Sequence, residues 1–248
     1  MSKYHIHMGA AVIFLLLTGA VAGCTKGFDK LAADPARPSD APVSALMNTI
    51  ASAMQNDGSE YTFLFNELYT PLSELNGSSK RLGVDAVSRS NAPLWTRYYH
   101  MMKNVRDAEQ KIRSYKGDTD VYVNVKAVMK IMTAQVTLRT VNFFGDIPFS
   151  QAGYAFSGPQ QVLQPRYDAQ QDIYTQALAD LQWASEHLQL ESGATTASGE
   201  PLQPVSANID PYFGGNLLSW KAFANGLRLR YALLLSDVAP QQATAIIT

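Results

Sequence analysis

The residue types that most often carry out catalysis are sparse in this 248-residue sequence, and none is spaced for a reaction. Apart from two histidines within the first seven residues there are His100 and His187, and neither has a cysteine, histidine or carboxylate at metal-ligand spacing. Gly214 and Gly215 lack the lysine of a phosphate-binding loop, and no hydrolase or zinc-protease motif is present. We therefore predict no catalytic residue, no metal ligand and no cofactor.

Cys24 is the residue to which a specific modification can be assigned. It is the only cysteine in the chain, so an internal disulfide is impossible. An apolar run follows Lys3 and ends in Val21-Ala22-Gly23-Cys24, which resembles a bacterial lipobox. In such a box the thiol receives a diacylglycerol, the peptide is cut before the cysteine and the new amine is acylated. We predict a signal peptide over 1–23 and lipidation of Cys24, with each acyl methylene contributing about 0.8 kcal/mol to membrane binding. An ordinary signal peptide with an incidental cysteine is the alternative.

Beyond the signal, the composition predicts a tether and a globular body. Residues 24–42 carry three prolines among small and charged residues, which is typical of an extended segment. The chain is 46% hydrophobic, enough to bury a core within residues 43–248. Lys and Arg number 20 against 21 Asp and Glu, so the charge gives no reason to expect nucleic acid as a partner.

The longest apolar pattern lies in residues 118–149 and predicts a helix that other helices must cover on one side. Asp118 or Thr119 can cap its start, Gly145 can supply the left-handed residue just past its end, and Pro148 prevents it from resuming. The apolar stripe consists of Val121, Val125, Val128, Met129, Met132, Val136 and Val141. A packed corner is expected after the helix, because it is crowded by Phe143, Phe144, Ile147 and Phe149.

Shorter helical patterns flank this one, and no stretch alternates convincingly as a strand, so we predict an all-α body. The helix that ends at Gly117 should form an antiparallel hairpin with the one after it. Gln171, three residues after Asp168, predicts a reciprocal capping box, and Pro240 is expected to stop the last helix. Pro93 is expected at the first turn of a helix that starts at Asn91. The other helix starts are predicted at Pro42, Tyr61, Asp168 and Asn216. Loops are predicted over 76–92, 150–167 and 191–208.

Aromatic side chains gather near these loops. Their faces can stack on the C–H patches of sugar rings while amides and carboxylates bind the hydroxyls. Hydrophobic packing explains the same residues equally well, and composition does not decide between the two. The residues are Tyr61, Tyr69, Trp95, Tyr154, Phe156, Tyr212 and Phe213.

Five stretches of the sequence occur in a specific order. They are FDKLAADPARP after Cys24, LWTRYYHMMKNVRDAE, LRTVNFFGDIPFSQA, PRYDAQQDIYTQALADL and LLSWKAFANGLRLRYAL. This ordered set resembles the SusD/RagB family of Bacteroidetes surface lipoproteins, nearest to its SusD-like branch. The turn FGDIPF is similar to the family's Gly-Asp-x-Pro-Tyr, with Phe149 where Tyr is usual. Gly226 stands where the family commonly shows Ser.

The resemblance implies a tetratricopeptide-like helix-pair superhelix, although no 34-residue repeat is visible in the sequence. It also implies a lipid-anchored protein of the outer membrane, exposed at the cell surface. Such a protein binds glycans, or oligopeptides in some members, and delivers them to a SusC-like TonB-dependent transporter without performing a reaction. In the family the region around the loop from Asn76 often faces the ligand. We therefore take Asn76, Trp95 and Tyr98 as candidate ligand-binding residues, with core packing as the alternative for Trp95 and Tyr98.

The family also sets an expectation about length. Its members are about twice as long as this chain, so we expect residues 43–248 to be the N-terminal part of a longer helical domain whose C-terminal part is missing. A helical-repeat scaffolding lipoprotein without a small ligand is the alternative function.

Overall fold

A computed structural model shows that the chain is built from α-helices, as the sequence predicts. It describes residues 41–55, 58, 70, 73, 84–155 and 162–247, and for 84–91 the backbone alone. Within these residues no strand forms, and β-pairing is limited to two isolated bridges, Ile147 with Asp168 and Thr195 with Pro201. The elements are α3 (Val43–Ser52), α6 (Val84–Arg113), the 3₁₀ turn η2 (Thr119–Tyr122), α7 (Val123–Phe144), α8 (Gln170–His187), α9 (Leu217–Leu235) and α10 (Pro240–Ile247).

Some of the sequence predictions concern residues outside this set. They are the signal peptide over 1–23, the lipidation of Cys24, the helix beginning at Tyr61 and the ligand contact of Asn76. The chain separates into the units Met1–Ala41 and Pro42–Thr248, and the helices named above belong to the second.

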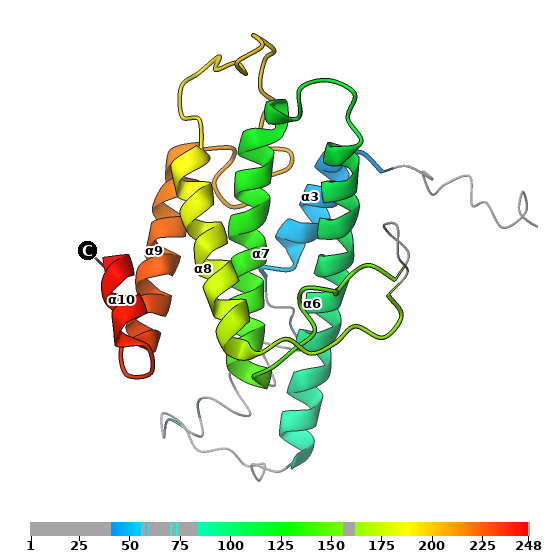
Figure 1. Cartoon of the computed structure of the whole chain (residues 1–248). Coiled ribbons are helices and arrows are strands. Elements are labelled where there is room, and N and C mark those ends of the chain that lie inside the picture. Colours follow the sequence, from blue (N-terminus) through cyan, green and yellow to red (C-terminus); the bar gives the residue numbers. More distant parts are fainter. Residues whose placement is uncertain are drawn as a thin grey trace, which may run out of the picture. The chain divides into compact units, whose positions relative to one another are not determined.

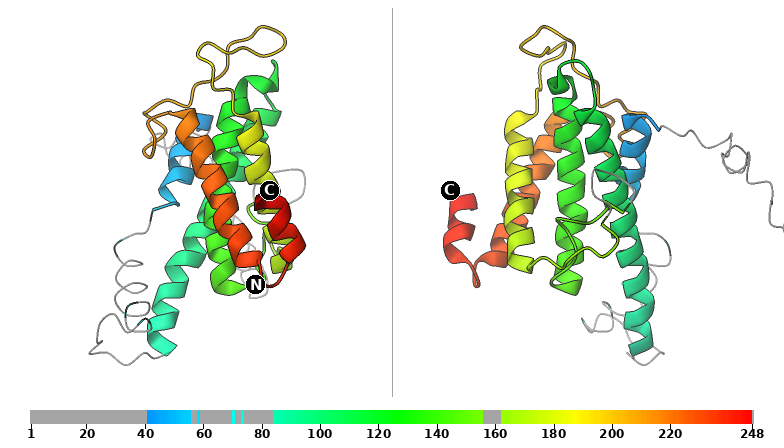
Figure 2. Two further views of the ribbon diagram at one scale, coloured as in Figure 1. Left: turned by 90° about the vertical axis from the view of Figure 1, so that its left-hand side faces the viewer. Right: turned by 45° about the vertical axis from the view of Figure 1, so that its right-hand side comes forward.

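The central helix of the second unit is α7. It packs between α6 and α8, which run antiparallel to it, and it also contacts α3 and α9 (Figures 1 and 2). Every residue of the predicted apolar stripe is buried, which confirms the stripe. The prediction of a single buried side is wrong, because neighbours on several sides also bury Ala127, Ile131, Ala134, Thr137, Leu138 and Thr140.

Local signals at both ends of α7 work as predicted. Asp118 accepts a hydrogen bond from the backbone N–H of Asp120 at 2.9 Å and so caps η2, which leads into α7. Gly145 has a φ of 71° and donates its N–H to the carbonyl of Val141 at 2.8 Å. The helix therefore ends at Phe144, and the chain leaves it in a fixed direction.

The start of α6 differs from the prediction. The helix begins at Val84, so the loop predicted over 76–92 is wrong for its last residues, and Pro93 lies inside the helix instead of opening it. An internal proline costs a backbone hydrogen bond, roughly 3 kcal/mol, and is tolerated where packing holds the helix on either side. On the C-terminal side that packing is extensive, because α3 and α7 bury Leu94, Tyr98, Met101, Met102, Val105, Ala108 and Ile112.

The start of α9 is held by two side chains. Asn216 caps it as predicted, accepting a hydrogen bond from the N–H of Ser219 at 3.0 Å. Upstream, Asp210 is 2% exposed and accepts hydrogen bonds from the N–H groups of Tyr212, Phe213 and Gly215. Its carboxylate also accepts the indole N–H of the fully buried Trp220 at 2.7 Å. The turn and the helix are therefore fastened together at one carboxylate.

The end of α9 was only partly predicted. The helix ends at Leu235, and the chain turns into a further helix, α10, which packs against α9. Pro240, predicted as a stop, is the first residue of α10, where a missing N–H costs no helical hydrogen bond.

Candidate ligand-binding site

The structure gives the candidate residues of α6 different environments. Tyr98 is fully buried where α6 meets the core, so its side chain offers no surface to a ligand. The core-packing alternative therefore fits Tyr98, and its assignment as a ligand contact is corrected. Trp95, one turn earlier, is only partly buried. Ligand contact by Trp95 and by Asn76 stays a prediction.

Trp95 belongs to a cluster of aromatic rings that joins α6 to the end of α7. Its ring centroid lies 4.8 Å from that of Tyr99 and 5.1 Å from that of Phe144, and the Trp95–Phe144 pair meets edge to face. Tyr99 in turn packs edge to face on Tyr98 at 4.8 Å. We call Trp95, Tyr99 and Phe144 the aromatic corner, and each of them keeps partial exposure. Such geometry fixes the ring planes in a low-energy arrangement.

The turn after α7 is docked onto α6 by hydrogen bonds to its backbone carbonyls. The Tyr99 hydroxyl donates to the carbonyl of Pro148 at 3.1 Å. Arg106 donates through Nη2 to the carbonyl of Phe149 at 3.2 Å and through Nε to that of Ala152 at 3.1 Å. The packing predicted for the turn after α7 is therefore confirmed, and polar side chains of α6 hold this turn in place.

Two aspartates fasten the same turn to the start of α8. Asp168 accepts hydrogen bonds from the N–H groups of Phe149 at 3.0 Å and Ser150 at 2.7 Å, and from the Ser150 hydroxyl. Asp146 accepts the N–H of Gln170 at 2.8 Å and so serves the N-terminus of α8. The capping box predicted at Asp168 is wrong, because its carboxylate is turned towards the loop and Asp146 takes over the role from the preceding turn.

These contacts set the ionisation of the groups involved. Burial alone would raise the pKa of Asp168, but the hydrogen bonds from Ser150 and Phe149 outweigh burial and hold this pKa below its usual range. Burial raises the pKa of Tyr99, and the neighbouring Tyr167 and Asp168 raise it further. Tyr99 is therefore a neutral phenol at physiological pH and remains a hydrogen-bond donor to Pro148.

The loop that leaves the turn lies close against α6. Gly153 has a φ of 85°, and a Cβ placed there would lie 2.7 Å from the backbone carbonyl oxygen of Met102. The Arg106 guanidinium lies 4.8 Å from the ring centroid of Tyr154. This close backbone approach requires glycine and adds to the rigidity of the corner.

Chemically, the corner is a fixed apolar surface with polar groups at its edge. Tyr167 is 64% exposed and close enough to Tyr99 to affect its pKa. Such a surface can stack on a sugar ring, but it holds no assembled nucleophile and base. Across the described residues no group of three or more histidine, cysteine or acidic side chains is placed to hold a metal ion.

Sequence reasoning did not select Tyr99 or Tyr167. The available signal was weak, because Tyr98 and Tyr99 are adjacent on a helix and only the structure shows which of them faces the core. Phe144 was expected to pack, but its contact with Trp95 spans 49 positions of sequence and could not be inferred from spacing.

The chain matches the sequence model of one protein family, described as "Starch-binding associating with outer membrane" (SusD-like_2), over residues 35–248. A search of curated proteins found no match. Among the described residues, no helix is both long enough and apolar enough to span a bilayer.

Solved structures with a similar fold agree with this match. A chitin-binding protein is 27% identical with a TM-score of 0.59, over 83% of this chain and 41% of its own. A chitin-binding SusD homolog from Flavobacterium johnsoniae is 22% identical with a TM-score of 0.58, over 82% and 41%. A SusD homolog from Bacteroides ovatus is 20% identical with a TM-score of 0.55, over 79% and 37%. The chain thus spans about two fifths of the length of these structures.

Proposed function

The chain belongs to the SusD-like family, and from that premise we propose that it is a cell-surface lipoprotein that binds glycans and delivers them to a SusC-like TonB-dependent transporter. The observation that carries the proposal is the family match over residues 35–248, whose description names starch binding and the outer membrane. Two of the similar solved structures are chitin-binding proteins. Oligopeptides are the alternative ligand class.

The aromatic corner supports the binding part of the proposal. Trp95, Tyr99 and Phe144 have fixed ring planes and partial exposure, so they can cover one face of a pyranose without first losing side-chain freedom. Asn76 is proposed as a second contact, from its place in the region that faces the ligand in the family. Binding would leave the glycan chemically unchanged.

The anchoring part rests on the sequence around Cys24. Lipidation there would hold the protein on the outer membrane by two or more acyl chains, which is sufficient for stable attachment. The extended segment 24–42 would serve as the tether between the lipid and the helical body.

Metabolic labelling and affinity purification test this proposal together. Radiolabelled palmitate should enter the wild-type protein in a Bacteroidetes host and should not enter Cys24→Ser. Purification of the wild-type protein from solubilised outer membranes should recover a TonB-dependent transporter. Labelling that is equal in both proteins, or a wild-type preparation free of any such transporter, would contradict the anchoring or the delivery role respectively.

The scaffolding alternative is favoured by one observation. Several large apolar side chains of α9 are exposed, among them Leu218 at 64%, Leu229 at 49% and Leu233 at 59%. Exposed apolar surface of this kind often marks contact with another protein. A glycan array separates the two functions, because a scaffold without a small ligand gives no saturable signal on any glycan.

A further inference from the structure

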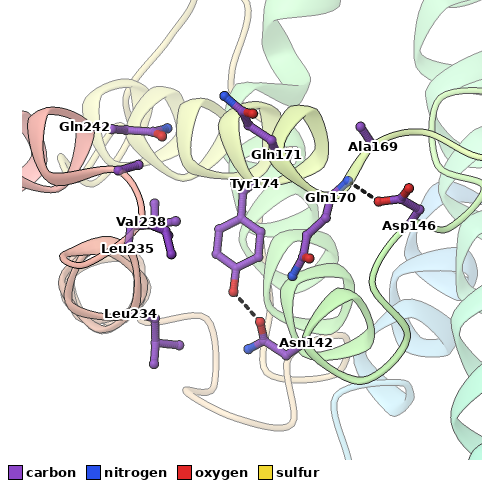
Figure 3. Close-up of a pocket in the computed structure, with 11 residues that line it drawn as sticks. Asn142, Asp146, Ala169, Gln170, Gln171, Tyr174, Leu234, Leu235, Val238 and Gln242 are labelled. Atoms are coloured by element: carbon purple, nitrogen blue, oxygen red, sulfur yellow. Dashed lines mark hydrogen bonds between the residues drawn. The ribbon is translucent and has the colours of Figure 1, made fainter.

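A second candidate site lies beside the turn of residues 145–149, to which Tyr99 of the aromatic corner donates a hydrogen bond. It is a cleft of about 720 Å³ between the end of α7, the start of α8 and the α9–α10 junction (Figure 3). Its volume lies within the roughly 300–1,000 Å³ that is usual for small-molecule sites. Residues from three segments of the sequence, 142–146, 169–174 and 234–242, therefore line one open cleft.

One wall of the cleft is polar, and part of its hydrogen-bonding capacity is already used. The Tyr174 hydroxyl donates to Oδ1 of Asn142, and Oδ1 of Asp146 accepts the N–H of Gln170 (Figure 3). This leaves the Asn142 amide N–H₂ as a donor and the second Asp146 oxygen as an acceptor. The side-chain amides of Gln170 and Gln171 add donors and acceptors to the same wall.

Tyr174 is a buried and rigid part of this polar wall. Its side chain is only 6% exposed, and its ring packs edge to face on Tyr231 with centroids 5.9 Å apart. Burial raises the pKa of Tyr174, so the phenol stays protonated and continues to orient Asn142. The Asn142 amide is thus oriented before any ligand arrives, which lowers the entropic cost of binding.

The opposite wall is apolar and open. Leu234 is 55% exposed and Val238 is 79% exposed, and both line the cleft. Gln242 extends from α10 towards α8 and offers a further amide at this side (Figure 3). A ligand in the cleft would meet an apolar surface on one face and hydrogen-bonding groups on the other.

The charge of the lining restricts the ligand class. Asp146 is the one charged residue of the eleven that line the cleft, and no lysine, arginine or histidine is among them. An anionic ligand would therefore meet a carboxylate and no cation among the lining residues. The donors and acceptors together suit a ligand that carries many hydroxyl groups and no charge.

We infer that this cleft is a second saccharide-binding subsite, which takes a short uncharged oligosaccharide. The C–H face of one sugar ring packs on Leu234 and Val238, and its hydroxyls exchange hydrogen bonds with Asn142, Asp146 and Gln242. The inference rests on the proposed function, because it assumes that the protein handles glycans. It places a binding site away from the aromatic residues that were selected from the sequence.

The chain offers closely matched variants for a test. Leu234→Ser with Gln242→Ala removes one apolar and one polar contact from the α9–α10 side of the cleft. The control is Leu233→Ser with Gln241→Ala, which changes the same residue types at neighbouring positions that do not line the cleft, with Leu233 at 59% exposure. Since all four side chains are wholly or partly exposed, both double variants are expected to fold, and thermal unfolding checks this directly.

Calorimetric titration of the full chain with N,N′,N″-triacetylchitotriose and with maltotriose gives the readout, in the wild-type and Trp95→Ala backgrounds. In the Trp95→Ala protein we expect residual binding of at least one sugar. The cleft variant should weaken that binding by about tenfold or more, and the control should leave it within about twofold of the parent. This pattern supports the subsite.

Other outcomes are equally decisive. If Trp95→Ala abolishes all binding, or if the cleft and control variants behave alike, the subsite is overturned while glycan binding at the aromatic corner stands. If the cleft variant removes all binding and Trp95→Ala removes none, the subsite stands and the role of the corner falls. If the wild-type protein binds neither sugar and a glycan array is blank, the proposed function fails and the subsite fails with it. Binding of a neutral tripeptide in place of sugars at the cleft would overturn the ligand class.

Discussion

At the scale of single residues, three aspartates position elements that the chain brings together from different places. Asp118 caps η2, Asp168 fixes the loop after α7, and Asp210 joins a turn to Trp220. Each carboxylate accepts several hydrogen bonds, and each has a pKa held below its usual range. For Asp210, burial would raise the pKa, but the N–H groups of Phe213 and Gly215 and the Trp220 indole outweigh it.

Replacing Asp210 should therefore be costly. In Asp210→Asn, an amide N–H₂ replaces one of the two oxygens that accept hydrogen bonds in the wild-type protein. The buried N–H groups that donated to this oxygen then have no acceptor. We expect the free energy of unfolding to fall by about 3 kcal/mol, measured by urea denaturation. Asp237→Asn, at an exposed position just after α9, is the control and should change stability by less than about 0.5 kcal/mol. Equal midpoints for the two variants would contradict this account of Asp210.

The lowered pKa values also predict a pH dependence. The ordinary pKa of an aspartate is 3.8, and those of Asp168 and Asp210 in the folded protein are lower. Their contribution to stability is therefore complete above the ordinary pKa and is lost as the pH falls through the folded-state values. The urea midpoint of the wild-type protein should fall steeply below about pH 4, and its advantage over Asp210→Asn should shrink over the same range. An advantage that is the same at pH 3 and pH 7 would show that ionised Asp210 is not the cause.

At the scale of elements, close backbone approach decides which glycines matter. Gly215 has a φ of 87°, and a Cβ there would lie 2.2 Å from the carbonyl oxygen of Val205, which is backbone and cannot move away cheaply. Gly199 has a similar φ of 83° but open space around it. Comparing substitutions at the two positions therefore distinguishes the cost of a steric clash from the cost of a left-handed backbone.

Alanine at these two glycines should have unequal effects. Gly199→Ala should cost about 1 kcal/mol for the left-handed backbone alone. Gly215→Ala should cost about 3 kcal/mol or more, because it must also displace the 205–206 backbone from the start of α9. Thermal unfolding followed by circular dichroism gives both values, and a Gly215→Ala protein as stable as Gly199→Ala would refute the close approach.

Helix ends that are determined by residues close in the sequence were predictable. Asp118 and Gly145 mark the ends of the η2–α7 segment with short-range signals, and the structure confirms both. The start of α6 was not predictable, because Pro93 is a common first residue of helices and only packing allows it inside one. The capping of α8 was not predictable for a similar reason. The capping carboxylate comes from Asp146, 24 positions away, and a local motif cannot reveal such a partner.

The candidate site was predictable only in part. Trp95 was selected because it follows a loop that often faces the ligand in the family that the sequence resembles. Its neighbours Tyr99 and Phe144 depend on how α6 and α7 cross. Tyr98 was selected with it and proved to be core. The cleft beside Tyr174 was missed, because its lining comes from three distant segments and consists mainly of amide and aliphatic side chains.

At the scale of the whole molecule, the helices form a frame that brings two surfaces to one end of α7. The turn of residues 145–149 lies between them, with Tyr99 and Arg106 holding one side and Asp146 holding the other. The family match and the fold of the solved structures describe the same frame. This chain spans about two fifths of the length of those structures.

The measurement that tests the central claim most directly is calorimetric titration of the full chain with chitin and malto-oligosaccharides, comparing wild type with Trp95→Ala and with Tyr115→Ala. Tyr115 is an aromatic residue that is 39% exposed just beyond the other end of α6, so it controls for the loss of a ring. We predict saturable binding of at least one sugar, weakened about tenfold or more by Trp95→Ala and unchanged by Tyr115→Ala. Absence of binding to the wild-type protein, or equal affinity in all three, would contradict the account.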